Sequence, residues 1–410
     1  GMPHKEDKDT VSKLVSDARR IAEQMNSSMV QFLADLIAIR SYTGQEGPAV
    51  ERTLQELKAI GCDKIWTDSA GNALGQIGSG SRVILYNAHL DTNEVADESE
   101  WPHPPLQPTI ENGAMYGLGA SDCKGGVASI VYGAAIRKAL GYMDDVSLVV
   151  MGATLEEDAE GFALRSLVER DGLRPEVVLL AEATNMGLSI GQRGRCEVRV
   201  RTLGKAAHAS MPYLGENAIL KMAPVVEALE AMNSSLPVHP IFGKGNQVVS
   251  VISGPHTPNS VPSWCEVTLD RRMVPGETAD SVLDSINSVV GPLGAQARIP
   301  DQPVTAHTGL PLDGPSFYPG WLLSEDSPLL KAGQAVCQAL WDRPAPVDVW
   351  RFSTDGTYSA GVAGIPTLGF GPQEQKYVHT AYDQVDLKKL FDAALFYALF
   401  PFQYCTQMDS

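Results

Sequence analysis

The chain has 410 residues, of which 44% are hydrophobic and 20% charged, and its formal charge is −17 at pH 7. This length corresponds to two or three domains at about 100–200 residues each and allows a sizeable core. Because no cluster of lysines and arginines offsets the acidic excess, we expect no nucleic-acid partner.

The six cysteines are scattered and form no C-x-x-C pair, as in cytoplasmic proteins whose thiols stay reduced. No run reaches the roughly eighteen consecutive apolar residues of a membrane span, and the N-terminal region is charged rather than signal-like. We therefore expect a cytoplasmic protein with no membrane partner.

The first half of the chain alternates helical and buried-strand patterns. A polar helical segment becomes amphipathic at residues 29–39, and a second helix over 53–60 stops at Gly61. Apolar runs at 83–88, 146–151 and 177–181 predict buried strands, and a small-residue helix is expected at 127–140. This alternation is typical of an α/β fold with a central sheet flanked by helices.

Beyond Glu182 the hydrophobic pattern changes to alternation. Residues 196–201 alternate with period two, and strands at 248–252, 265–270 and 296–299 are interspersed with helices at 218–232 and 279–290. This stretch predicts an α+β unit whose sheet has one exposed face. Because a buried-strand pattern returns at 365–370, we expect a discontinuous first domain, 1–191 and 306–410, with a second domain inserted at 192–305.

Acidic residues and histidines follow several of the predicted buried strands. His89 and Asp91 end the first run, Glu156 and Glu157 follow the second, and Glu182 closes the third. In open α/β sheets, ligands gather at the carboxyl ends of the strands. Together with Asp122 and His379, which lie in other segments, these side chains offer enough donors for two metal ions and leave one carboxylate as a base.

The glycine-rich segment before Asp122 has an alternative interpretation as a dinucleotide-binding loop. The last position of its G-x-G-x-x-G pattern is Asp122, however, and a carboxylate there would repel a pyrophosphate. A nicotinamide oxidoreductase is therefore disfavoured, whereas bound nucleotide in the purified protein would support it.

Four segments resemble the signatures of a known enzyme family, in order and spacing: Tyr86-Asn87-Ala88-His89-Leu90-Asp91-Thr92, Gly117-Leu118-Gly119-Ala120-Ser121-Asp122-Cys123-Lys124-Gly125-Gly126, Thr154-Leu155-Glu156-Glu157-Asp158 and Ala181-Glu182-Ala183-Thr184. The family is that of the co-catalytic zinc aminoacylases, which includes acetylornithine deacetylase, succinyl-diaminopimelate desuccinylase, glutamate carboxypeptidase and carnosinase-type dipeptidases. Gly191-Gln192-Arg193-Gly194-Arg195, Asp270-Arg271-Arg272 and Phe352-Ser353-Thr354-Asp355-Gly356 are most similar to its selenium-metabolism-linked hydrolase branch.

The resemblance implies a zinc-peptidase-like catalytic domain with a mixed central sheet, plus an inserted lid and dimerisation domain. It also implies two zinc ions per subunit, with cobalt possible: His89 and Glu182 on one ion, Glu157 and His379 on the other, and Asp122 bridging them. Glu156 would be the general base, Asp91 would support His89 from behind, and a cis peptide would follow Asp122.

The inserted domain supplies substrate contacts in this family. Gly204-Lys205-Ala206-Ala207-His208-Ala209 is similar to the lid motif, whose histidine stabilises the oxyanion in the partner subunit's site. Asn259 and Arg272 match positions that bind the substrate's polar groups and its carboxylate, and Gly371 matches a loop near the second metal. An ion pair of Arg272 with Asp270 or Glu277 is the alternative. Ala181-Glu182-Ala183 and Asp383 depart from the usual residues without removing a ligand.

We therefore expect a homodimeric, two-zinc hydrolase that cleaves an amide bond of an N-acyl amino acid or short peptide with a free carboxylate. Deacylase and dipeptidase activities remain open, because their chemistry is the same and only the pocket differs. Carbamoyl-amino-acid hydrolysis and a non-catalytic protein that kept the fold are the alternatives, although no residue of the set is missing.

Overall fold

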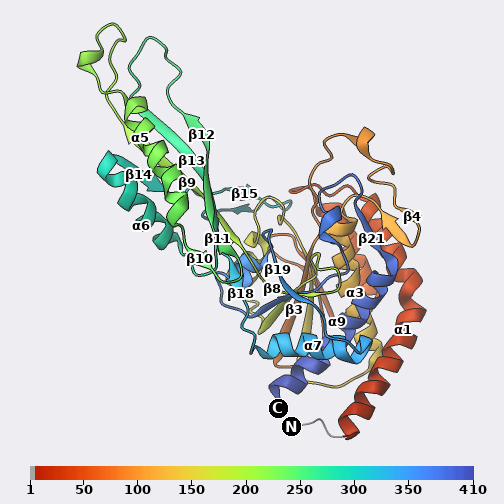
Figure 1. Cartoon of the computed structure of the whole chain (residues 1–410). Coiled ribbons are helices and arrows are strands. Elements are labelled where there is room, and N and C mark those ends of the chain that lie inside the picture. The colour runs from red at the N-terminus through yellow and green to blue at the C-terminus, as the bar shows by residue number, and fades with distance from the viewer. Residues whose placement is uncertain (1–4) are drawn as a thin grey trace.

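The structure is a computed structural model that describes residues 5–410, and a nine-stranded sheet organises its larger part (Figure 1). In spatial order the strands are β1 (Lys64–Thr67), β2 (Ala73–Ile77), β6 (Val146–Ala153), β3 (Arg82–His89), β7 (Val177–Leu180), β20 (Thr367–Gly369), β8 (Leu188–Gln192) and β18 (Trp321–Leu322), and β19 (Val347–Trp350) also pairs with β8. The four strands β6, β3, β7 and β20 are parallel, whereas β2 runs antiparallel to β6 and β8 runs antiparallel to β20. The predicted mixed sheet is therefore confirmed, and the carboxyl ends of its parallel strands share one edge.

Helices cover both faces of this sheet because its central strands are apolar on both sides. Ile84 and Tyr86 point into one core and Leu85 into the other. The first core is closed by α1 (Lys5–Ala38), α2 (Gly47–Ala59), α3 (Gly125–Leu140), α7 (Pro328–Trp341) and α9 (Leu387–Met408). The second contains α4 (Phe162–Arg165) and the turn that follows it.

A second sheet forms an arm that projects from the larger part (Figure 1). Its strands are antiparallel, in the order β12 (Asn246–Ser253), β13 (Trp264–Met273), β9 (Gly194–Leu203) and β14 (Ala295–Arg298), and the short β17 (Phe317–Tyr318) also pairs with β9. Buried and less buried residues alternate along β9, and Val198 and Val200 pack with α5 (Ala218–Ala231) and α6 (Ala279–Val290). The predicted α+β unit with one exposed sheet face is what the arm contains.

The remaining elements are small, and some elements of the main sheet escaped sequence reasoning. The hairpin β1–β2, the strand β8 and the helices α7 and α9 were not predicted. The small elements are β4 (Thr109–Glu111), β5 (Ala114–Tyr116), β21 (Gln384–Asp386), β10 (Val238–His239), β11 (Gly243–Lys244), β15 (Val304–Thr305), β16 (Pro311–Leu312) and α8 (Gly356–Ser359). Within residues 5–410, no helix combines the length and the apolar character that crossing a membrane requires.

Candidate metal centre

Side chains from five segments meet at the shared carboxyl edge of the parallel strands. His89 ends β3, Glu156 and Glu157 follow β6, and Glu182 follows β7. Asp122 lies in the turn before α3, and His379 lies between β20 and β21. Three of the five segments converge because β3, β6 and β7 are parallel neighbours, so their ends lie side by side.

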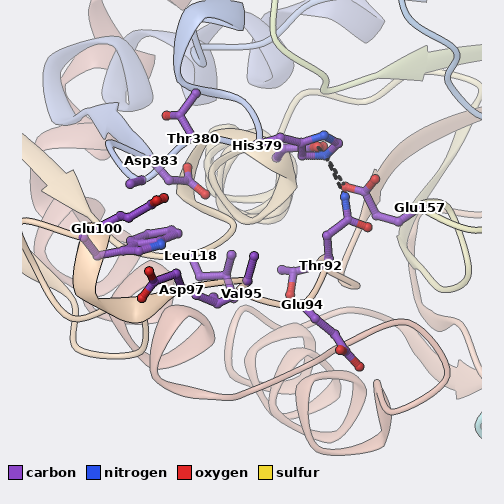
Figure 2. A pocket seen from close by; sticks show the side chains of 15 residues that line it. Thr92, Glu94, Val95, Asp97, Glu100, Leu118, Glu157, His379, Thr380 and Asp383 are labelled. Atoms are coloured by element: carbon purple, nitrogen blue, oxygen red, sulfur yellow. Dashed lines mark hydrogen bonds and ion pairs between the residues drawn. The ribbon is translucent and has the colours of Figure 1, made fainter.

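On the outer side of this cluster, His379 faces two carboxylates, of which Figure 2 labels that of Glu157. Its Nε2 lies 2.8 Å from Oδ2 of Asp122 and 3.1 Å from Oε1 of Glu157. The Asn93 amide nitrogen is 3.2 Å from the same ring atom. The side chain of His379 is 52% exposed, so this side of the cluster is open to solvent.

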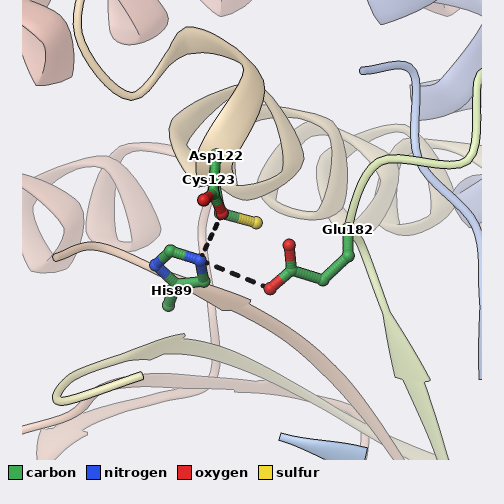
Figure 3. A group of neighbouring side chains, drawn as sticks. All are labelled: His89, Asp122, Cys123 and Glu182. Atoms are coloured by element: carbon green, nitrogen blue, oxygen red, sulfur yellow. Dashed lines mark hydrogen bonds and ion pairs between the residues drawn. The ribbon is translucent and has the colours of Figure 1, made fainter. Parts of the chain in front are cut away.

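On the inner side, His89 is fully buried and faces the other oxygen of Asp122 (Figure 3). Its Nε2 lies 2.7 Å from Oδ1 of Asp122 and 3.3 Å from Oε1 of Glu182. Cys123, joined to Asp122 by the expected cis peptide bond, completes this group of neighbours. Its Sγ lies 3.2 Å from the carbonyl oxygen of Ala181.

The two oxygens of Asp122 therefore face two different histidines. Glu157 lies beside His379, whereas both Glu156 and Glu182 lie beside His89. The potential ligand atoms of His89, Asp122 and Glu182, with Cys123, lie within 4.8 Å of one another, and so do those of His89, Asp122, Glu156 and Glu157. Carboxylate and imidazole donors in this arrangement suit two zinc or cobalt ions with a shared aspartate. The donor set thus fits the expected metals.

Charge and burial at the cluster also call for bound cations. Burial, and after it the charge of Asp122, raises the pKa of Glu157 to about 8. Burial likewise raises the pKa of Glu156 and that of Glu182. Hydrogen bonding to Asp122, and then to Glu157, raises the pKa of His379 to about 10. The raised pKa values show that so many buried carboxylates are unfavourable in their charged form when no cation is near. Bound divalent cations would offset this repulsion.

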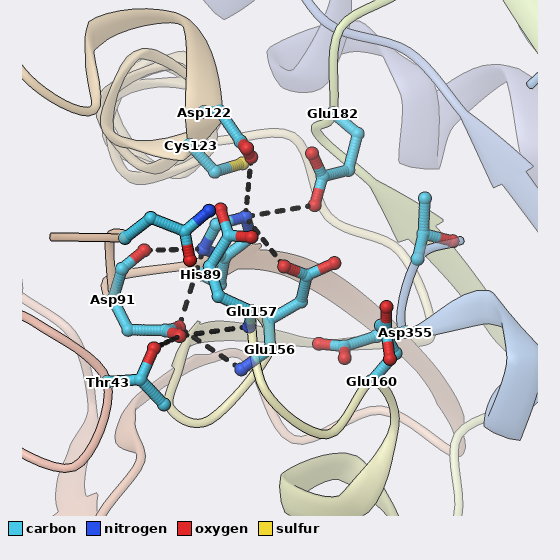
Figure 4. Close-up of polar contacts among 12 residues, drawn as sticks. Thr43, His89, Asp91, Asp122, Cys123, Glu156, Glu157, Glu160, Glu182 and Asp355 are labelled. Carbon is cyan, nitrogen blue, oxygen red and sulfur yellow. Dashed lines mark hydrogen bonds and ion pairs between the residues drawn. The ribbon is translucent and has the colours of Figure 1, made fainter. Parts of the chain in front are cut away.

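Asp91 connects the two sides of the cluster from behind (Figure 4). Its backbone carbonyl lies 2.9 Å from Nδ1 of His89, which orients the ring so that Nε2 faces the cluster. Its carboxylate accepts hydrogen bonds from the backbone nitrogens of Glu156 (3.2 Å) and Glu157 (3.0 Å) and from the Thr43 hydroxyl (2.7 Å). Asp91 therefore supports both His89 and the pair of glutamates.

Two further carboxylates that hold this site were not identified as site residues from the sequence. Glu46 is buried and accepts a 2.9 Å hydrogen bond from the backbone of Leu155, whose φ is 64° and therefore left-handed. Asp383 accepts bonds from the backbone nitrogens of Gly119 (2.7 Å) and Ser121 (2.8 Å), which fixes the loop leading into the cluster. Neither role has a local sequence signal, because each contact spans more than a hundred residues.

A pocket of about 550 Å³ lies between the cluster and the root of the arm, and Glu156, Glu157, Glu182 and His379 line it. Arg272 lines it too, while both its Nε and Nη2 bond the Asp270 carboxylate at 2.7 and 3.1 Å. Glu277 bonds Arg271 instead. Arg195, the cross-strand neighbour of Arg272, is a lining residue that sequence reasoning missed.

His208 and Asn259 do not line this pocket. They lie together in the loops at the far end of the arm, where the Ala209 nitrogen bonds the Asn259 carbonyl (2.8 Å) and His208 pairs with Ser260. Nδ1 of His208 accepts a bond from the Ser210 backbone nitrogen (3.1 Å), which leaves the ring proton on Nε2. Its Nε2 is thus a donor available to another molecule.

Gly371 is also outside the pocket lining. It packs against the backbone of Glu182, where an added Cβ would lie 2.2 Å from the carbonyl oxygen. Its nitrogen bonds the Thr184 hydroxyl at 2.8 Å. The structure therefore gives this glycine a close contact behind a candidate ligand, and its expected contact with substrate stays a prediction.

Comparison with known proteins agrees with this geometry. Residues 190–298 match the peptidase dimerisation domain of the M20 family. Over 388 residues the chain is 34% identical to the Escherichia coli K12 protein YgeY, which is uncharacterised, with 93% of this chain and 96% of that protein covered. The chain belongs to the M20 peptidase family.

Two other M20 comparisons extend over most of the chain. The succinyl-diaminopimelate desuccinylase of Alkalilimnicola ehrlichii is 26% identical over 365 residues, covering 84% of this chain and 91% of that protein. The structure of the Bacillus subtilis protein YxeP, described as a dinuclear metal-binding peptidase of this family, superposes with a TM-score of 0.67 at 13% identity, covering 94% and 99%. The chain is thus an M20 metallohydrolase, and the closer branch suggested by its motifs stays a prediction.

Proposed function

We propose that this M20 metallohydrolase cleaves an amide bond next to a free carboxylate, in an N-acyl amino acid or a short peptide. The observation that supports this best is the placement of Asp122 between two histidines that each have glutamate side chains beside them, with Arg272 lining the same pocket. Two candidate metal sites and the guanidiniums of Arg195 and Arg272 around a single cavity suit a substrate that has a polarisable carbonyl and a carboxylate at a fixed separation.

Five side chains would hold the two ions, zinc by preference and cobalt as the alternative: His89, Asp122, Glu157, Glu182 and His379. When bound, the ions polarise the scissile carbonyl and lower the pKa of the attacking water.

Glu156 is the general base in this proposal. Its carboxylate lies 3.2 Å from His89 at the wall of the pocket, and its residue is only 5% exposed. From this position Glu156 can take a proton from the attacking water and pass it to the leaving amine. Arg272 binds the substrate carboxylate in place of part of its contact with Asp270, and this fixes the amide over the cluster.

His208 and Asn259 act in the partner's site. The arm exposes apolar side chains on its edge strand β12, where Val248, Val251 and Ile252 are each more than half exposed, and on the neighbouring helix α5, where Leu220 is 71% exposed. An open strand edge with apolar neighbours suits pairing with a second copy of this chain. Such a homodimer brings the Nε2 donor of His208 to the oxyanion of the other subunit.

The test combines a substrate panel with one isosteric change. Metal-loaded protein is assayed against N-acyl amino acids, N-carbamoyl amino acids and dipeptides, and Glu156→Gln is compared with the wild type. We expect a loss of about 10²–10⁴-fold in kcat with metal content unchanged, because Glu156 is the base and not a ligand. Glu98→Gln, on an exposed loop, is the matched control. Wild-type turnover by Glu156→Gln, or loss of both metals, would contradict these roles.

A further inference from the structure

Two pockets flank the candidate metal cluster, and they share a wall formed by Asn93, Asp122, Glu157 and His379. The pocket toward the arm is the one that contains Arg195 and Arg272. The other, of about 250 Å³, lies between the segment that follows β3 and the segment that follows His379. The two halves of a substrate whose scissile carbonyl lies at the shared wall can therefore occupy the two pockets.

The two pockets differ in their cationic side chains, because Arg195 and Arg272 line the pocket toward the arm beside its carboxylates. No lysine or arginine is among the described residues that line the 250 Å³ pocket, whereas Asp97 and Glu100 do line it. Figure 2 shows these two carboxylates at the end of the pocket opposite to His379 and Glu157. The hydrogen bonds that Ser99 donates hold the pKa of Asp97 below its usual range, so this carboxylate is charged at neutral pH.

An aromatic ring lies in the same wall. Trp101 follows Glu100 directly and lines the pocket with it. No side-chain cation of residues 8–410 is among the ring partners of this indole, although seven such pairs occur elsewhere in the described chain. Carboxylates and an indole face without a cation of their own form a wall that suits an ammonium group. The wall is independent of the metal ligands, because its residues lie at the far end of the cavity.

We propose that the acyl half of the substrate carries a protonated amine, so that the enzyme acts on aminoacyl amino acids rather than on simple N-acyl amino acids. This inference rests on the proposed function and answers the question of deacylase or dipeptidase that the motifs leave open. The substrate is dipolar: its carboxylate lies at Arg272, and its ammonium lies at Asp97, Glu100 and Trp101.

Matched substrates isolate this charge. Glycyl-, β-alanyl- and γ-aminobutyryl-alanine are compared with propionyl-, butyryl- and pentanoyl-alanine, because each pair differs only by an ammonium in place of a methyl group. We expect kcat/KM to favour the ammonium member by about tenfold or more in at least one pair, and the preference to fall as salt is added. The pair with the largest ratio reports how far the ammonium lies from the scissile carbonyl.

Two isosteric substitutions assign the preference to the wall. In the double variant Asp97→Asn/Glu100→Gln, we expect the ammonium preference to fall about three- to tenfold, with the methyl substrates hardly changed. Asparagine keeps the helix-capping role of Asp97, so the loop should retain its conformation. Glu98→Gln lies in the same loop but outside the pocket lining, and it should leave the ratio within about twofold.

A binding measurement separates this inference from the proposed function. The dissociation constants of the same pairs are measured by calorimetry on metal-loaded Glu156→Gln, which binds without turnover. Tighter binding of the ammonium members, lost in the double variant, supports the inference even if turnover is slow. Equal affinities within every pair overturn it. Failure of every substrate to be hydrolysed by the wild type overturns the proposed function instead.

Discussion

If His208 serves the partner's site, two inactive variants of this chain should restore activity when their subunits exchange. Within one chain, Arg195 lies beside the metal pocket, and β9 continues from there to Leu203 before the loop that contains His208. Eight residues of strand at about 3.3 Å each span roughly 26 Å, which is far beyond the reach of an imidazole. His208 therefore has no access to the cluster of its own chain in this conformation.

The expected activities follow from the symmetry of the dimer. Glu156→Ala removes the base and His208→Ala removes the oxyanion donor, at a cost of about 10²–10⁴-fold and 10²–10³-fold respectively. Random exchange after equal mixing makes about half of the dimers mixed, and each mixed dimer has one intact site and one doubly defective site. About a quarter of wild-type activity should return, at least some twentyfold above either variant alone.

The assay is turnover of a hydrolysed substrate against time after mixing, with mass tags on the two variants to follow exchange. Mixing the Glu156→Ala variant with Glu156→Ala/His208→Ala is the matched control, because neither partner then has the base. Complete exchange without recovered activity would refute the argument, and the oxyanion would then be stabilised without His208.

Three further predictions concern other side chains. Arg272→Ala should lower kcat/KM for substrates with a free carboxylate by about 10- to 100-fold but hardly affect amidated analogues, and equal losses in paired assays would remove its role as an anchor. Glu46→Ala should lower kcat about tenfold or more, because the left-handed Leu155 loses its acceptor, whereas Glu46→Gln keeps one and should retain most of the activity. Burial raises the pKa of Asp355 to about 7 in the folded protein. Between about pH 4 and 7 the folded protein therefore binds more protons at this residue than the unfolded chain does, and the free energy of unfolding falls as pH rises through this window. Asp355→Asn keeps an acceptor for the Gly161 nitrogen but no longer titrates. The melting temperature of the variant minus that of the wild type should therefore rise from about pH 4 to 7 and level off above pH 7. Melting temperatures of the two metal-stripped proteins that change in parallel with pH would contradict the assignment.

Candidate metal ligands could be predicted from the sequence because several of them directly follow buried strands of the main sheet. His89, Glu157 and Glu182 follow apolar runs that are long enough to be strands, and parallel strands end at one edge. The arm was equally visible, because the alternation along β9 differs from the continuous apolar runs of the main sheet. The short edge strands and the C-terminal helix α9 were missed, since a strand of four residues has no reliable period and α9 is apolar around most of its circumference.

Contacts between distant segments could not be predicted. Glu46 lies in a polar turn whose sequence resembles any surface loop, and only the folded chain places it under Leu155. Arg195 was read as part of a motif, but its position opposite Arg272 depends on the register of β9 and β13. The second pocket could not be predicted either, because Asp97 and Glu100 come from an acidic stretch that composition alone would assign to the solvent-exposed surface.

One antiparallel ribbon links the two functions proposed for the arm. β9 and β13 pair without interruption from Gly194 opposite Met273 to Leu203 opposite Trp264. Arg272 is at the root of this ribbon, beside the metal pocket of its own chain, and the loops with His208 and Asn259 extend from its tip. A two-stranded pairing of this length, backed by α5 and α6, holds the two ends at a fixed separation. A lone subunit would thus hold the metals, the base and the carboxylate anchor, yet would leave the oxyanion without its donor, so catalysis would depend on assembly of the dimer.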